Sequence, residues 1–86
     1  MTMKTIRLTT HARKQAAERG ATEDDITEAI RSGSREPAKH GRELCRYNFA
    51  FGGLWQGKTY PIKQVAPVIK EDAHEIVVIT VYTFYF

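Results

Sequence analysis

The residues best suited to chemistry are a histidine near the start of the chain and two hydroxyl-bearing residues near its end. His11 falls in the first turn of an expected helix beside a basic cluster, and its imidazole titrates near neutral pH, as a general base must. Thr80 and Tyr82 alternate along an expected strand, where a hydroxyl can bind a phosphate and an aromatic ring can stack on a base. If the three side chains converge, they could act on RNA.

Each of these residues also has a purely structural interpretation. His11 can be a packing or capping histidine, since one imidazole without a visible partner does not identify a site. Thr80 and Tyr82 can close the core, or they can form a dimer contact together with the aromatic end Phe84-Tyr85-Phe86. The sequence leaves these alternatives open.

Basic residues could bind the phosphates and stabilise the transition state. Arg46 interrupts an apolar-rich strand, although it can equally lie on a solvated face, and Arg19 can bind a phosphate or pair with the carboxyl end of its helix. Residues 1–20 and 37–63 each carry five basic residues against one acidic residue, so they would form a positive surface if they meet. Further RNA-binding candidates are Arg13, Arg42, Lys58, Lys63 and the base-stacking candidate Trp55.

The spacing of the histidines, the cysteine and the glycines gives little support for a metal site or a cofactor site. The three histidines and the single cysteine lie in separate segments without HxxxH, HxH or CxxC spacing, so we expect no metal site. There is also no Walker, GxSxG or dinucleotide-binding glycine pattern, and we expect no cofactor. Cys45 falls on the apolar face of an expected strand, which argues against a Cys–His hydrolase.

Capping residues predict two consecutive helices that position His11 and Arg19. A threonine start and Gly20 predict the first helix from about Thr10 to Arg19. Thr22 followed by Asp25 resembles a capping box, and the apolar face that follows it ends at Gly33, which predicts the second helix.

After the second helix the hydrophobic pattern changes to a period of two. Residues 42–51 predict a strand with one apolar face, which Gly52-Gly53 should break. Residues 58–70 contain Pro61 and Pro67, which predict an interrupted or edge strand. Residues 75–85 are rich in Val, Ile, Thr, Tyr and Phe, which predicts a central strand covered on both faces.

The order of elements predicts an α+β fold in which the two helices pack on one face of a roughly four-stranded antiparallel sheet. On the last strand, Val77, Ile79 and Val81 should lie under the helices, while Thr80 and Tyr82 face the other way. That outward face is where the candidate site is expected.

Length and composition bound the other possibilities. With 86 residues, 42% of them hydrophobic, the chain fits one domain over residues 1–86 with a small core and a shallow site. The net charge of +3 suits an anionic partner without requiring one. No segment resembles a signal peptide or a membrane span, so the expected location is the cytoplasm.

The stretch LTTHARKQAAERGATEDDITEAIRSG, with the closing strand VVITVYTFYF, resembles the bacterial domain-of-unknown-function family 4258. That family is similar in predicted topology to the barnase, EndoU, colicin and RelE group of small ribonucleases. The resemblance implies a toxin-like domain that cleaves RNA without a metal. The matching positions are His11 and Arg19 in the helix motif and Thr80 and Tyr82 in the closing Thr-x-Tyr, whereas Gln15 stands where the family tends to have arginine.

Three functional hypotheses follow. The first is a metal-independent ribonuclease, or a degenerate relative of one, with His11 as the base, Arg19 and Arg46 as phosphate contacts, and Thr80 and Tyr82 positioning RNA. Its partners would be RNA and an antitoxin or immunity protein. The second is a non-catalytic module that binds a protein or a nucleic acid. The third is a homo-oligomeric structural protein, such as a homodimer formed through the aromatic carboxyl-terminal strand.

Overall fold

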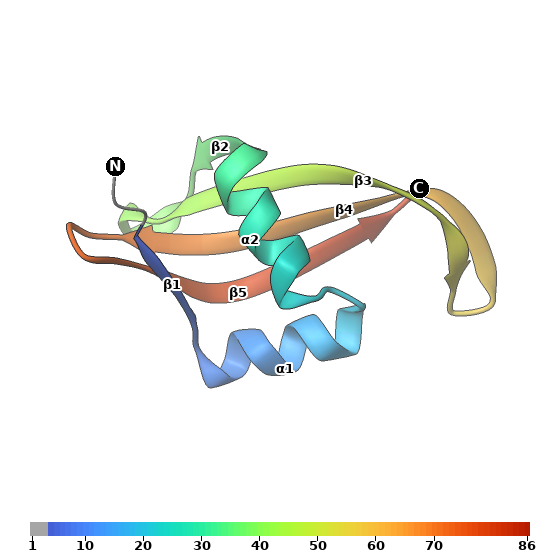
Figure 1. Cartoon of the computed structure of the whole chain (residues 1–86), viewed down its shortest axis with the longest axis horizontal. Helices are drawn as coiled ribbons and strands as arrows, with labels where there is room; N and C mark the ends of the chain where they lie inside the picture. The colour runs from blue at the N-terminus through green and yellow to red at the C-terminus, as the bar shows by residue number, and fades with distance from the viewer. Residues whose placement is uncertain (1–3) are drawn as a thin grey trace.

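The computed structural model describes residues 4–86, which form an α+β fold of two helices and a five-stranded mixed sheet (Figure 1). The strands lie in the order β1-β5-β4-β3-β2; β1 is parallel to β5, and all other neighbours are antiparallel. In chain order the elements are β1 (Thr5–Leu8), α1 (Thr10–Arg19), α2 (Glu23–Ser32), β2 (Ser34–Pro37), the 3-10 helix η1 (Lys39–Gly41), β3 (Glu43–Trp55), β4 (Lys58–Glu71) and β5 (Glu75–Tyr85).

The predicted α+β class with two helices is confirmed, but the predicted four-stranded antiparallel sheet is wrong. The two strands that were not expected, β1 and β2, have four residues each, which is too short for an alternating pattern to stand out. Strand β1 joins β5 in the parallel direction, with Ile6 opposite Ile76.

Local capping explains both helices. The Thr9 hydroxyl accepts a hydrogen bond from the backbone N–H of Ala12 at the start of α1, and Gly20 ends that helix with a left-handed φ of 78°. The second helix begins with a full capping box, in which the side chains and backbone N–H groups of Thr22 and Asp25 bond reciprocally. The predicted helix boundaries are therefore confirmed to within a residue.

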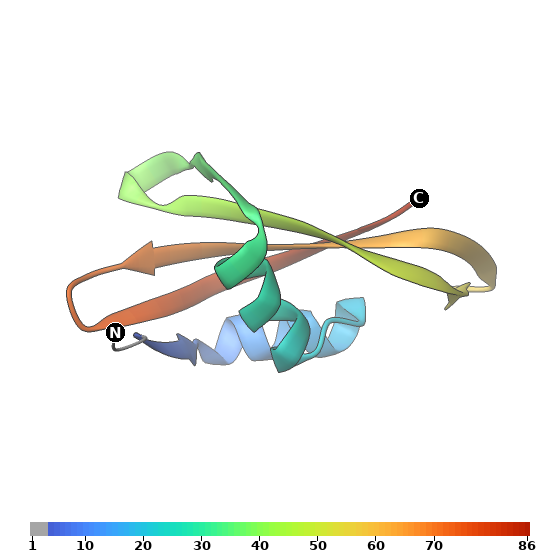
Figure 2. The same ribbon diagram turned by 45° about the horizontal axis from the view of Figure 1, so that its top comes forward.

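The helices cover one side of the sheet and one of its edges (Figures 1 and 2). Helix α2 crosses the sheet over β3 and β4, whereas α1 runs alongside β5. The buried core lies between these layers and includes Ala12, Ile26, Val65, Ile69 and Val78, each fully buried. Within residues 4–86, neither helix is long and apolar enough to cross a membrane.

The segment predicted as an interrupted or edge strand is instead the middle strand of the sheet. Strand β4 pairs with β3 on one side and β5 on the other. Pro67 is tolerated there because the β3–β4 register passes from Leu44–Val68 directly to Tyr47–Val65, so the ladder is open beside the residue that lacks an N–H.

Two β-bulges change the expected alternation. In β3 the register shifts between Ala50 and Gly53, so the strand continues to Trp55 through the glycine pair that was predicted to end it. In β5 the register shifts beside Ile79, because Val68 pairs with Thr80 while Ile69 pairs with Val78.

The β5 bulge decides which residues face the helices. Ile76 and Val78 are buried before it and Val81 is buried after it, so Val77 and Ile79 do not lie under the helices as predicted. After the bulge the prediction holds: Val81 faces the core, and Tyr82 is exposed on the opposite side. Strand β5 is interior only where β1 covers it, over Glu75–Val78, and the rest of that edge meets helix α1.

Candidate functional site

The sheet face opposite the helices carries a row of two aromatic rings flanked by two arginines, which we call the aromatic row: Arg19, Tyr82, Phe84 and Arg46. The Tyr82 and Phe84 rings are nearly parallel, with an interplanar angle of 24° and centroids 6.5 Å apart, and they are 44% and 45% exposed. The guanidinium carbon of Arg19 lies 5.5 Å from the Tyr82 centroid, and that of Arg46 lies 5.8 Å from the Phe84 centroid.

Polar neighbours on the same face hold Arg46 in place. Its guanidinium donates to the Glu36 carboxylate at 3.2 and 3.3 Å and to the Gln64 side-chain oxygen at 3.0 Å. The Gln64 amide in turn donates to Asn48 at 2.8 Å. Because side chains from both neighbouring strands bind it, Arg46 presents a positioned cation, although Glu36 neutralises part of its charge.

Helix α1 covers the edge of β5 at the other end of the row. Gln15 accepts hydrogen bonds from the Thr80 hydroxyl and from the backbone N–H of Val81, while Arg19 donates to the Val81 carbonyl at 2.6 Å. The two side chains thus satisfy backbone groups that a neighbouring strand would otherwise bind. As a result Arg19 is anchored beside Tyr82, and Thr80 is tied to the helix that carries His11.

His11 is exposed and stands one helical turn before Gln15. Residues four apart share a helix face with Cβ atoms about 5–6 Å apart, so the imidazole lies on the side of α1 that meets β5 at Thr80. The part of the chain that the structure describes thus brings Arg19, Arg46 and Tyr82 into the aromatic row, whereas His11 lies at the other end of α1, about 12 Å from Arg19 along the helix axis.

The residues predicted as further RNA contacts are dispersed. Arg13 pairs with Glu23 at 2.5 Å between the two helices, and Lys58 lies over the Tyr60 ring in the β3–β4 hairpin. Arg42 is half-buried in the connection between η1 and β3.

Trp55 packs on the helix side of the sheet, away from the aromatic row. Its ring stacks on Tyr85 with centroids 4.6 Å apart and an angle of 13°. The neighbouring Tyr85 hydroxyl donates to the Arg19 carbonyl at 2.7 Å, at the end of α1. Trp55 therefore contributes to packing around the helix corner, whereas the sequence suggested a base-stacking residue.

Lys63 is also on the helix side, where it ties the helix corner to the sheet. Its ammonium donates to the Gly20 carbonyl at 3.0 Å and to the Asp25 carboxylate at 2.9 Å, and its side chain is only 12% exposed. Burial acts to raise the pKa of Asp25, but the hydrogen bonds and charge of Lys63, with the Thr22 bonds, outweigh it and lower that pKa. The role of Lys63 is therefore to hold the helices rather than to meet RNA.

Replacing Lys63 by methionine is expected to lower the free energy of unfolding by about 2 kcal/mol, because it leaves a largely buried carboxylate without its cation. Urea unfolding measures this loss. The matched control is Lys58→Met, which removes an exposed lysine of the same strand and should change stability by less than about 0.5 kcal/mol. Equal effects of the two substitutions would contradict the assigned role.

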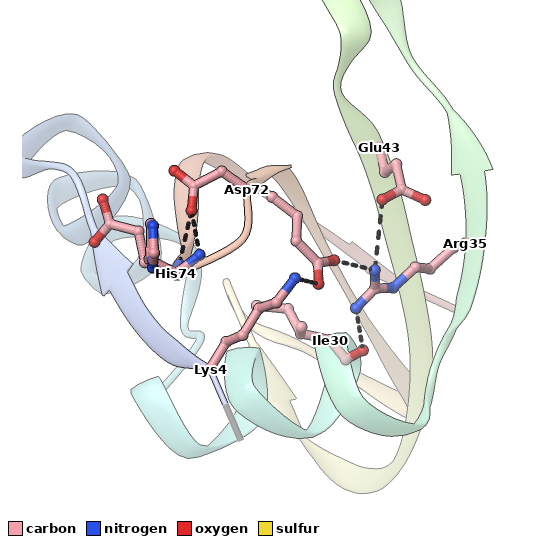
Figure 3. A network of polar contacts seen from close by, with 8 residues as sticks. Lys4, Ile30, Arg35, Glu43, Asp72 and His74 are labelled. Carbon is pink, nitrogen blue, oxygen red and sulfur yellow. Dashed lines mark hydrogen bonds and ion pairs between the residues drawn. The ribbon is translucent and has the colours of Figure 1, made fainter. Parts of the chain in front are cut away.

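A second polar cluster, which the sequence did not predict, joins the beginning of the chain to β2 and β4 (Figure 3). Glu71 accepts hydrogen bonds from Lys4 at 2.7 Å and from Arg35 at 2.6 Å, and Arg35 also reaches Glu43 at 3.4 Å and the Ile30 carbonyl at 3.3 Å. A shallow cavity of about 380 Å³ lies beside the cluster, but its cations are largely committed to Glu71. The cluster fastens the edge strands to the middle strand.

The hydrogen bond from Lys4, followed by that from Arg35, lowers the pKa of Glu71. Its ion pairs therefore add stability above its ordinary pKa of about 4.5, and this contribution is lost as the pH falls below that value. We expect Glu71→Gln to cost about 1 kcal/mol of unfolding free energy near neutral pH and less near pH 3, because the contribution is lost as the pH falls through the lowered pKa of the folded state. Urea titrations at both pH values, with the exposed Glu18→Gln as a control, test this; a loss independent of pH would argue against the ion pairs.

Neither metal binding nor cysteine chemistry is favoured by the side chains of the described residues. Within the described residues, no three His, Cys, Asp or Glu side chains gather where they could hold a metal ion. Cys45 is fully buried, and burial raises the pKa of its thiol, which disfavours the reactive thiolate. The open face therefore offers cations, hydroxyls and aromatic rings.

Sequence reasoning missed Phe84 and Gln64 as members of the site and gave Gln15 no role. The helix period does place Gln15 on the face of His11, but its hydrogen bonds to β5 were not predictable from that position. The alternation Thr80, Tyr82, Phe84 likewise places the second ring beside the first. Gln64 has no such signal, because its position beside Arg46 depends on the β3–β4 register.

No curated protein and no solved structure matches this chain. A family model described as "Domain of unknown function (DUF4258)" matches residues 8–83, which include both helices and nearly all of the three long strands. The family expected from the helix motif is thereby confirmed: the chain belongs to the DUF4258 family.

Proposed function

We propose that the chain binds RNA on its open sheet face and cleaves it without a metal ion. The observation that carries this proposal is the aromatic row, in which two exposed rings lie between two anchored arginines. Aromatic rings stack on bases, and arginines bind phosphates. Both kinds of group are thus available on one accessible surface, and His11 is exposed on the helix that supplies Arg19.

The proposed reaction is an internal transesterification. His11 removes the proton of a ribose 2′-hydroxyl, and the oxygen attacks the adjacent phosphorus. A bond forms between phosphorus and the 2′-oxygen, the bond to the 5′-oxygen breaks, and the leaving oxygen takes a proton from water. Arg19, on the helix that carries His11, stabilises the added negative charge on the phosphoryl oxygens. Arg46 binds a second phosphate at the other end of the row, and Thr80 and Tyr82 position the strand.

The DUF4258 family is similar in predicted topology to the barnase, EndoU, colicin and RelE ribonucleases, and this reaction is the one that the likeness implies, because those enzymes act without metals. The likeness also suggests a partner for the proposed enzyme. A toxin of that kind would be held inactive by an acidic antitoxin or immunity protein, which would compete with RNA for the same cationic face.

RNA cleavage in a chelator tests the proposed activity. A short fluorescent RNA should be cut into one fragment with a 2′,3′-cyclic phosphate and one with a 5′-hydroxyl, and the same sequence as DNA should stay intact because it lacks the attacking hydroxyl. RNA that binds but is never cut would remove the catalytic part of the proposal. RNA that does not bind at all would remove the whole of it.

The exposed apolar residues of the carboxyl-terminal segment favour a second candidate, a protein interface. Phe84 and Phe86 are 45% and 55% exposed, and Tyr82 extends the same surface. Such a patch suits another protein or a second copy of the chain. Sedimentation over a range of concentrations, compared with a variant lacking the last three residues, distinguishes this candidate, because a dimer formed there should dissociate when they are removed.

A further inference from the structure

We propose that the aromatic row selects unpaired nucleotides, so that the substrate is single-stranded RNA rather than a duplex. This inference rests on the proposed function and names its substrate class. It depends on the spacing and accessibility of the Tyr82 and Phe84 rings, which are two residues apart on one face of β5.

The ring spacing does not match stacked bases. The ring centroids are 6.5 Å apart, close to the two-residue repeat of a β-strand. Stacked neighbouring bases are separated by about 3.4 Å, roughly half of that spacing. Two neighbouring bases can therefore each meet a ring only if they are separated from one another, as in an extended single strand.

The accessibility of the Tyr82 and Phe84 rings also favours single-stranded RNA as the substrate. A base inside a duplex is covered above and below by its neighbours, so only its edges can be reached in the grooves. The rings of Tyr82 and Phe84 are 44% and 45% exposed on the sheet face opposite α2 (Figure 2), where an unpaired base can reach them.

The two arginines fix where the strand runs. Arg19 is held by the Val81 carbonyl and Arg46 by Glu36 and Gln64, so each is positioned beside one ring before any ligand arrives. Phosphates flanking two stacked bases would then meet a cation near each ring. Since stacking and phosphate contacts do not read base identity, binding should tolerate many sequences.

Measurements of RNA affinity test whether the aromatic row selects single-stranded RNA over a duplex. Fluorescence anisotropy compares one short RNA as a single strand and as a duplex with its complement, in the His11→Ala variant so that no RNA is consumed. We expect the duplex to bind at least tenfold more weakly. Tyr82→Leu and Phe84→Leu should each weaken single-strand binding by about 5- to 150-fold, the range found when one base loses its stacking partner.

Tyr60→Leu is the matched control, because the Tyr60 ring lies beside Tyr85 and outside the row. It should leave the affinity unchanged, and circular dichroism confirms that all three variants fold. Equal binding of single strand and duplex, or full affinity in both row variants, would overturn the inference while leaving RNA binding itself intact. Failure of both RNA forms to bind would instead overturn the proposed function.

Discussion

Replacing His11 by alanine is expected to lower the rate of RNA cleavage by about 10²- to 10⁴-fold, the usual contribution of a general base. RNA affinity should stay unchanged, because His11 is not part of the aromatic row and its exposed ring makes little contribution to packing. Cleavage rates at saturating RNA measure the first effect, and anisotropy measures the second.

His74→Ala is the matched control for that substitution. His74 is an equally exposed histidine in the turn between β4 and β5, where its backbone N–H bonds to Asp72, so its side chain can be removed without touching the row. We expect full activity from this variant. Equal rates for the wild-type chain and His11→Ala would exclude the imidazole from the mechanism, even if RNA is cut.

Replacing Gly33 by alanine should destabilise the fold more than any other change considered. A Cβ at this position would clash with the backbone carbonyl oxygens of Ala29 and Arg46, where the end of α2 turns closely onto β3. Neither carbonyl can move without disturbing the helix or the strand, so we expect a loss of about 3 kcal/mol or more. Thermal unfolding should occur more than about 10 °C below the wild-type midpoint.

Gly41→Ala separates this clash from the general cost of replacing a glycine. Gly41 has a left-handed φ of 70°, but no atom would lie within 4 Å of its new Cβ. The cost there is only the strain of that backbone conformation, about 1 kcal/mol. If Gly33→Ala unfolds at the same temperature as Gly41→Ala, the close approach of α2 to β3 is not as the structure has it.

The helices were predictable because the signals that define them are local. Thr9 and Thr22 bond to backbone groups three residues away, and Gly20 adopts a conformation that few other residues allow. Each of these features can be recognised within a few neighbouring residues. The boundaries of α1 and α2 therefore followed from the sequence alone.

The sheet was less predictable because its register depends on distant segments. The bulge beside Ile79 reverses the alternation of β5, which is why the inward residues were assigned correctly after it and incorrectly before it. Pro67 suggested an edge, yet β4 occupies the middle because its neighbour β3 leaves the ladder open there. Neither adjustment has a signature within its own strand.

The residues of the candidate site were likewise predictable where the signal is local, and not where their placement depends on the sheet. Tyr82 was expected on the outward face, and Arg19 reaches it because the end of α1 runs beside β5. Lys63 and Trp55 were grouped with these residues on charge and residue type, but the structure places them on the helix side. Composition suggests which residues can bind RNA, whereas only the sheet decides which of them share a face.

The most direct test of the central proposal is nuclear magnetic resonance on the isotope-labelled chain during titration with a short single-stranded RNA. The backbone amides of residues 80–84, together with those of Arg46 and Gln64, should shift in proportion to bound RNA, and the His11 ring signals should shift with them. The amides of Asp25 and of the Lys4–Glu71–Arg35 cluster should stay in place. Shifts confined to those latter regions, or no shifts at all, would contradict an RNA site on the open sheet face.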